Sequence, residues 1–143
     1  FFLQNNFAAY QDYALVGTKG YTFEGPFYLD FQGRIFGWDE EREEQAKKLV
    51  AREMERLQES FHQAEEAGYR KFVMFLHYPP TNVLEETSPF TRIAEEYGVE
   101  AVVYSHCHGE QRFGDSIRGT YRGIRYFLVS GDYLNFHPEQ ILA

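Results

Sequence analysis

The chain has 143 residues, of which 43% are hydrophobic and 18% aromatic, and its formal net charge is -8 at pH 7. This composition is too apolar for an intrinsically disordered chain, and residues 1–143 suit one domain or part of one. The negative charge argues against extended nucleic-acid binding through a basic surface. It does not exclude a small phosphorylated substrate, because bound cations would dominate the local field.

The cellular compartment is expected from what the sequence lacks. No apolar run approaches the roughly 18 residues that a membrane-spanning helix needs, and no charged-then-apolar leader opens the chain. The single cysteine, Cys107, excludes an internal disulfide and fits a reducing environment. We therefore expect a cytoplasmic protein without membrane contact, whose oligomeric state these features leave open.

The N-terminal part of the chain predicts short elements. Residues 1–9 suit a strand or a short helix, residues 13–17 a strand, and residues 21–23 a second short strand. Residues 25–37 are irregular and rich in aromatic side chains, which favours a loop folded onto its own small core. The alternative for these rings is a wall on the substrate side of a site.

A long amphipathic helix is predicted over residues 39–67. Asp39 is the expected N-cap, and Gly68 ends the helix. Apolar residues recur at spacings of three and four, the pattern of a helix that buries one face. They are Ala46, Val50, Met54, Leu57, Phe61 and Ala64. We expect this helix to lie on a sheet rather than to form a coiled-coil seam, with His62 on its exposed surface.

A strand-helix-strand unit is predicted next. Residues 72–76 are continuously apolar, which is typical of a strand buried on both faces, and two prolines soon after them prevent further strand pairing. A helix is expected over residues 87–97, capped by Thr87 or Ser88, and a second strand over residues 99–104. Such crossovers are almost always right-handed and leave their strands parallel, so both strands end at the same edge of the sheet.

The C-terminal part predicts one further strand and its connections. Residues 110–118 read as a polar connection, residues 119–122 as a hairpin-like approach, and residues 124–130 as a strand. A turn is expected over residues 131–134 and a terminal loop at 137–138. No internal repeat and no linker divides the chain.

Three of the five histidines lie at the ends of the paired strands. His77 ends the first strand, and His106 and His108 follow the second. Residues two apart in an extended segment point to the same side, so these imidazoles are expected to converge on the crevice where open α/β sheets bind ligands. Because imidazole is the commonest protein ligand for metals, we predict a metal site here. The alternatives are a histidine-rich surface turn, or one ligand beside a hydrogen-bonded core histidine.

These motifs resemble those of a known family. The sequences FLHYPP at residues 75–80 and YSHCHG at residues 104–109 resemble the C-terminal half of the calcineurin-like metallophosphoesterases. That family carries a lone His after one strand and Gly-His-x-His after the next. The resemblance extends through residues 119–121 and 123–130, although only the histidine motifs are specific. It implies an α/β fold that is the C-terminal half of a four-layer α/β/β/α sandwich, whose strand-helix-strand unit ends in metal-ligand histidines.

The resemblance also implies an activity. In it, His77 and His106 bind one divalent ion and His108 the other, with Mn, Fe and Zn all compatible with such ligands. The reaction is hydrolysis of a phosphate ester, in a small phosphorylated substrate or a phosphoprotein, by in-line displacement at two metal ions. No residue of this chain is assigned a catalytic role. Three arginines are candidates to grip a phosphate, with surface charge the preferred interpretation: Arg112, Arg118 and Arg122.

Two departures from the family pattern shape this prediction. Ser105 stands where the motif has Gly, a change small enough to be tolerated. The family's Asp-x-His, Gly-Asp and Gly-Asn-His-Asp motifs do not precede His77. Gly-Asp occurs at residues 114–115 and 131–132, after the histidines, and we interpret both as turn residues, with contact between Asp132 and the site as the alternative. We therefore expect the C-terminal part of a longer enzyme, inactive on its own.

Two other classes compete with a phosphoesterase. A non-catalytic module could hold a single Zn through the three histidines, with Cys107 as a fourth ligand. Cys107 lies between two residues expected to face the site, so its thiol should point away from them. A small redox protein built on Cys107 would lack a partner cysteine.

Overall fold

The structure is a computed structural model that describes most of the chain. The described residues are 3, 6–21, 41–82 and 86–142, together with the backbone alone of residues 28–29, 35–36 and 40. Within them the chain is an α/β protein with one six-stranded mixed sheet and two α-helices. The predicted fold class is confirmed at this level.

The six-stranded sheet has the order β1-β2-β5-β6-β8-β7. The four central strands run parallel to one another, whereas β1 and β7 pair antiparallel at the two edges. The strands, in sheet order, are β1 (Phe7–Tyr10), β2 (Tyr13–Thr18), β5 (Lys71–Leu76), β6 (Ala101–Tyr104), β8 (Ile124–Leu128) and β7 (Gly119–Tyr121). A separate two-stranded sheet pairs β3 (Tyr28–Leu29) with β4 (Ile35–Phe36), and a short 3₁₀ helix covers Glu110–Arg112.

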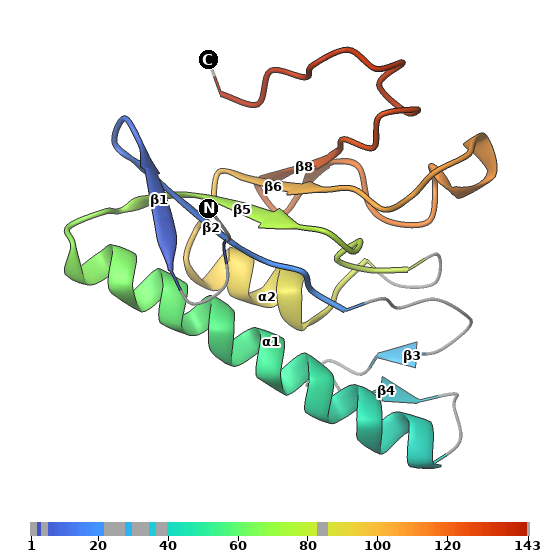
Figure 1. Cartoon of the computed structure of the whole chain (residues 1–143). Coiled ribbons are helices and arrows are strands. Elements are labelled where there is room, and N and C mark those ends of the chain that lie inside the picture. Colours follow the sequence, from blue (N-terminus) through green and yellow to red (C-terminus); the bar gives the residue numbers. More distant parts are fainter. Residues whose placement is uncertain are drawn as a thin grey trace.

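The long helix α1 (Glu40–Glu66) lies along one face of the sheet, as predicted, and contacts β1 and β2 (Figure 1). Its predicted apolar stripe faces the core, and only Met54 of the six residues is partly rather than fully buried. His62 is exposed, and its Nε2 lies 3.1 Å from the Glu66 carboxylate, as expected for a surface histidine. The predicted N-cap, Asp39, lies outside the described residues.

The second helix, α2 (Pro89–Glu96), connects β5 to β6 on the same face as α1 (Figure 1). Of the two caps considered, Ser88 is the one used: its hydroxyl accepts hydrogen bonds from the N–H groups of Phe90 and Thr91. Ser88 N–H in turn donates to the Thr91 hydroxyl at 2.8 Å, which completes a capping box. Because β5 and β6 are parallel neighbours, the predicted strand-helix-strand unit is confirmed.

The main core lies between the helices and the sheet. Phe61 of α1 is fully buried, stacks on Tyr97 with ring centroids 4.1 Å apart, and meets Phe72 of β5 edge-on at 5.1 Å. Burying an aromatic side chain of this size contributes roughly 1.5–3 kcal/mol. The helix-covered face of the sheet therefore forms a hydrophobic core that is closed to solvent.

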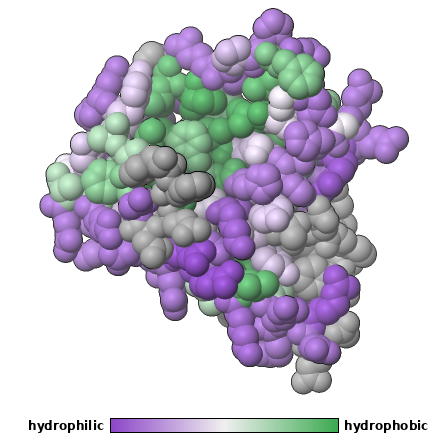
Figure 2. Space-filling view, viewed as in Figure 1, coloured by the Kyte–Doolittle hydropathy of each residue, from purple (hydrophilic) through white to green (hydrophobic). Residues whose placement is uncertain are grey.

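The opposite face of the sheet is apolar but thinly covered. Val73, Ala101 and Val103 are buried there, and the side chains packed on them are only partly buried. The C-terminal segment crosses this side of the sheet and brings Ile141 and Leu142 onto it (Figure 1). Figure 2 shows the hydrophobic patch that results on this side of the molecule.

Some N-terminal predictions fall partly outside the described residues. For the strand or helix expected over residues 1–9, the structure has a strand over Phe7–Tyr10, and residues 1, 2, 4 and 5 lie outside the described residues. Most of the strand at residues 21–23 and of the aromatic segment 25–37 is not described, although the backbones of β3 and β4 lie within the latter. In the part of the chain that is described, neither helix is long and apolar enough to cross a bilayer.

Candidate functional site

The four parallel strands end together at one edge of the sheet, which we call the carboxyl edge. Thr18 of β2 pairs with Leu76 of β5, Leu76 with Tyr104 of β6, and Tyr104 with Leu128 of β8. The segments that leave these strands therefore start side by side. They are residues 19–21, 77–80, 105–109 and 129–134. The edge that was predicted to gather the histidines is the one that does so.

His77 and His106 form a pair at this edge. Their ring centroids are 5.3 Å apart with an interplanar angle of 68°. The two loops are joined by a backbone hydrogen bond in which Ser105 N–H donates to the His77 carbonyl at 3.2 Å. The ring of Tyr78 meets both imidazoles edge-on, at 4.8 Å from His77 and 4.9 Å from His106. We call His77 and His106 the imidazole pair.

The backbone at His106 departs from what the sequence predicts. The alternation expected of an extended segment does not apply, because His106 has φ +71° and Cys107 N–H turns back to the Ser105 carbonyl at 2.8 Å. A non-glycine residue in this region stores strain of about 1–3 kcal/mol, and such strain gathers at functional sites. The tight turn still buries Cys107 completely in the helix-covered core, so its predicted direction is confirmed by a different local geometry.

His108 is held by a carboxylate from the end of β8. Its Nδ1 lies 3.0 Å from Asp132, which also accepts hydrogen bonds from Gly109 N–H at 2.6 Å and Tyr133 N–H at 3.1 Å. The Gly109 N–H and then the His108 ring keep the pKa of Asp132 below its ordinary value. A carboxylate accepts hydrogen bonds only, so Nδ1 of His108 carries the hydrogen. Neutral His108 therefore presents the lone pair of Nε2.

Asp132 corrects the interpretation of the second Gly-Asp sequence. It does lie in the turn after β8, as expected, but it also contacts a predicted ligand, the alternative that the sequence left open. The strand-end rule applied to His77 and His106 would also have placed residues 131–132 at this edge, because they follow a strand parallel to β6. Gly114-Asp115 behaves as a turn, with Asp115 paired to Arg112 at 3.0 Å.

The electrostatics of His77 link the three histidines. Desolvation by surrounding atoms lowers the pKa of His77, and the nearby rings of His106 and His108 lower it further by disfavouring a second positive charge. A lowered pKa keeps His77 neutral near pH 7. Neutral imidazole is the form that binds a metal ion.

The histidines are thus gathered at one edge but not closed into a finished cluster. Among the described residues, no group of three His, Cys, Asp or Glu side chains is arranged to hold a metal ion. His77 and His106 face each other, whereas His108 pairs with Asp132. The identity of His77, His106 and His108 as metal ligands stays a prediction.

The arginines considered for phosphate binding have partners of their own. Arg112 pairs with Asp115, Arg118 donates to the Tyr133 hydroxyl at 3.0 Å, and Arg122 pairs with Glu95. These contacts agree with the preferred interpretation of surface charge.

Comparison with known proteins was made at three levels: family models, curated proteins and solved structures. No protein-family model, curated protein or solved structure matches the chain. The class that the fold defines is an α/β protein with a six-stranded mixed sheet and two helices among its described residues.

Proposed function

We propose that the chain carries the C-terminal metal ligands of a metal-dependent phosphoester hydrolase of the calcineurin-like kind. The ligands are His77, His106 and His108. One observation carries the proposal: two imidazoles from the ends of adjacent parallel strands lie 5.3 Å apart, and the next histidine along is oriented by Asp132. Open α/β sheets bind their ligands at this edge.

The donor set fits half of a dinuclear site. Neutral imidazoles suit Mn, Fe or Zn, and ligand type does not decide among them. His77 and His106 would share one ion, and His108 would bind the other through Nε2. When bound, two such ions would coordinate phosphate oxygens and supply an activated hydroxide for in-line displacement. A carboxylate that bridges the ions is expected from the family's upstream Gly-Asp motif.

The chain's own residues prepare these ligands. Asp132 fixes the tautomer and orientation of His108, a role that carboxylates commonly play behind metal-bound histidines. Tyr78 packs against both rings of the imidazole pair, and the Ser105–His77 backbone bond keeps their loops in register. The lowered pKa of His77 reduces the competition between protons and a metal.

The thinly covered face supports the finer fold assignment. In a four-layer sandwich, the face of this sheet that lacks helices would pack on a second sheet, and here that face carries partly buried apolar side chains such as Leu15, Phe75 and Phe127. An upstream half that carries Asp-x-His, Gly-Asp and Gly-Asn-His-Asp would supply both that sheet and the missing ligands. The proposed substrate is a small phosphorylated molecule or a phosphoprotein, and the proposed location of the enzyme is the cytoplasm.

The competing class is a non-catalytic module that holds a single Zn. His77, His106 and His108 would be its ligands, but structural zinc normally has four ligands, most often thiolates. The only thiol, Cys107, is fully buried in the core. That position speaks against a closed structural zinc site.

Metal content and hydrolysis of an aryl phosphate with added Mn test the proposal. Residues 1–143 alone should bind about one ion weakly and show no turnover, because the described residues offer no group of three ligands and the family's bridging Gly-Asp motif does not precede His77. The chain extended by the upstream half should bind two ions and turn over, and His77→Ala and His108→Ala should each abolish this. His62→Ala, at an exposed histidine of α1, is the matched control and should leave activity unchanged.

Two outcomes would contradict the proposal. Turnover by the extended enzyme that persists in both histidine variants would remove the ligands from the reaction. Robust turnover by residues 1–143 alone, lost in both variants, would show instead that the site is complete without an upstream half.

A further inference from the structure

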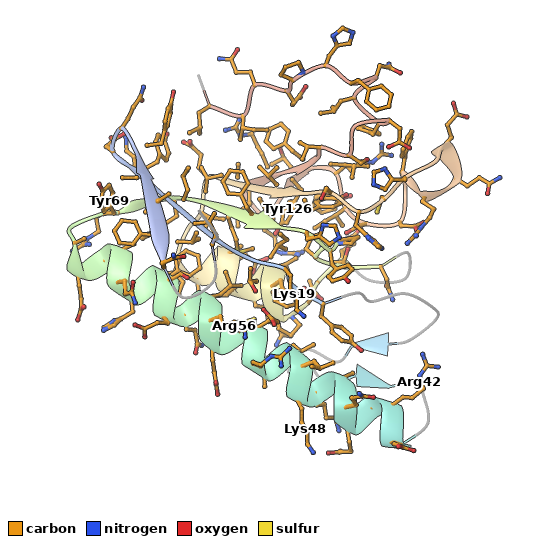
Figure 3. All side chains as sticks on the ribbon, in the orientation of Figure 1. Lys19, Arg42, Lys48, Arg56, Tyr69 and Tyr126 are labelled. Carbon is orange, nitrogen blue, oxygen red and sulfur yellow. The ribbon has the colours of Figure 1, made fainter. Side chains whose placement is uncertain are left out.

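A second feature of the carboxyl edge lies beside the imidazole pair. Lys19 leaves β2 as His77 leaves β5, and the Lys19 carbonyl accepts a hydrogen bond from Tyr78 N–H at 3.0 Å. A cavity of about 180 Å³ opens here between the strand ends and α1. It is lined by Lys19, Gly20, Tyr21, Leu49, Arg52, Glu53 and Tyr78. We call it the Lys19 pocket, and Figure 3 labels Lys19 near α1.

The pocket and the imidazole pair share one side chain. Tyr78 lines the pocket, and its ring also contacts both His77 and His106. Tyr78 is therefore the residue that links the pocket to the imidazole pair. The two features belong to one continuous surface at the carboxyl edge.

The acidic group of the pocket is already occupied. Glu53 is 1% exposed, and its carboxylate accepts a hydrogen bond from the Thr18 hydroxyl. It also pairs with Arg56 at 3.0 Å and with Arg52 at 3.6 Å. A buried carboxylate with this many donors has its charge balanced by the protein itself. The Glu53 carboxylate is therefore not available to bind a cation from solution.

The side chain of Lys19 supplies the pocket with a positive charge that no described carboxylate balances. Among the described residues, the exposed Lys19 ammonium makes no hydrogen bond or ion pair, and the partly buried Tyr21 lines the same pocket. Arg52 also lines the pocket, although its Nε already pairs with Glu53 at 3.6 Å, so Lys19 is the cation that the lining leaves unbalanced. Arg42 lies near enough to Tyr21 to oppose the rise that burial causes in the pKa of Tyr21. In a chain of net charge -8, this is a local positive site. Its chemistry selects an anion.

The size of the pocket limits that anion. The volume of the pocket is about 180 Å³, which is enough for several waters or one small ion. Drug-sized ligands fill pockets of roughly 300–1,000 Å³. The space therefore suits one compact oxyanion, a phosphate or a carboxylate, rather than a whole nucleotide.

We infer that the Lys19 pocket binds a second acidic group of the substrate, with the scissile phosphate at the histidines. The substrate class is then a phosphoester that carries another phosphate or a carboxylate close to the ester. This assignment rests on the proposed function, whereas the affinity of the pocket for a small anion does not.

Anion binding by the pocket is tested first, without metal. Inorganic phosphate and acetate are titrated separately into the chain in the presence of EDTA, and the backbone amide shifts of Gly20, Tyr21 and Tyr78 are followed by NMR. At least one anion should give saturable shifts there, and the tighter of the two identifies the preferred group. Lys19→Ala should weaken that binding about tenfold or more, because a charge-assisted hydrogen bond is lost.

Matched variants keep this test specific. Lys47→Ala removes an exposed lysine of α1 that pairs with Glu44 outside the pocket, and it should leave the titration unchanged. His106→Ala should also leave it unchanged, because no metal is present. Lys19 is exposed and its carbonyl contact with Tyr78 survives truncation, so the variant should remain folded, as thermal unfolding will verify. Anion binding by the Lys19 pocket would be ruled out if Lys19→Ala bound the anion as tightly as the unaltered chain, or if neither anion gave a saturable shift.

The substrate assignment is tested on the extended enzyme with Mn. Propane-1,3-diylbisphosphonate, which carries two phosphonates three carbons apart and resists hydrolysis, should bind more tightly than inorganic phosphate. Lys19→Ala should remove that preference while leaving the metal content at two. Loss of metal binding together with intact anion binding by the pocket would defeat the proposed function alone. Equal binding of the two probes by the metal-loaded enzyme would overturn the substrate assignment alone.

Discussion

The helix-covered face of the sheet and its carboxyl edge are built in different ways. On the covered face, Phe61, Phe72 and Tyr97 pack ring against ring, with α1 and α2 closing the core. At the edge, His106 has a positive φ, Lys19 is exposed, and individual hydrogen bonds rather than packing fix His108. The difference indicates that the face supplies stability, and that the edge uses some of it to hold reactive groups in place.

The largest expected effect is on the covered face. Phe61→Ala should lower the free energy of unfolding by about 3–5 kcal/mol, because it opens a cavity among rings that cannot collapse into it. Urea denaturation measures this. Phe75→Ala, on the thinly covered face, is the matched comparison and should cost less than half as much, since Phe75 is only partly buried. Equal costs would mean that the two faces are equally well packed.

The next effect is at the edge and concerns metal affinity rather than stability. Asp132→Asn should weaken Zn or Mn binding about 10–100-fold, because an amide has a single acceptor oxygen and cannot accept from both His108 Nδ1–H and Gly109 N–H as the carboxylate does. Isothermal titration calorimetry gives the affinity, and ring-nitrogen NMR reports the tautomer directly. Asp115→Asn, in the other Gly-Asp sequence, is the control and should change neither. An unchanged tautomer in Asp132→Asn would remove the positioning role.

A smaller effect concerns the strain at His106. His106→Gly should be roughly 1 kcal/mol more stable than His106→Ala, because glycine adopts φ +71° without penalty. Thermal unfolding compares the two variants, and neither should bind metal with the affinity of the unaltered chain. If alanine proves as stable as glycine, the backbone at this position is not strained.

The sequence predicts the helix-covered face of the sheet better than it predicts the contacts at the carboxyl edge. Apolar patterns found α1, the strand-helix-strand unit and the last strand, because a helix buries one face every 3.6 residues and a strand buried on both faces is continuously apolar. The same patterns placed His77 and His106 at one edge. The N-cap of α2 could be narrowed to Thr87 or Ser88 from the sequence, since a capping residue and its partner, here Ser88 and Thr91, are close in sequence.

The contacts at the edge follow no such period. The turn at His106 depends on a single backbone conformation, and the contact between His108 and Asp132 joins residues 24 positions apart. The Lys19 pocket needs three segments, the ends of β2 and β5 and the middle of α1, to be placed before it exists. Only the order of parallel strands, which sequence patterns do not fix, brings these side chains together.

The smallest expected effect lies at the boundary between the two regions. Cys107 stands between His106 and His108 in sequence, but its side chain is fully buried in the helix-covered core. Its carbonyl, which accepts a hydrogen bond from the Ser130 hydroxyl at 2.6 Å, belongs to the backbone and survives substitution.

Cys107→Ala should therefore leave metal affinity nearly unchanged and cost only the free energy of a small buried group, about 1 kcal/mol. Calorimetry with Zn and urea denaturation, run on the same preparation, separate the two effects. A tenfold or greater loss of Zn affinity would place the thiol among the ligands and favour the single-zinc module. Unchanged affinity with the small loss of stability would assign Cys107 to the core, one residue away from groups that belong to the site.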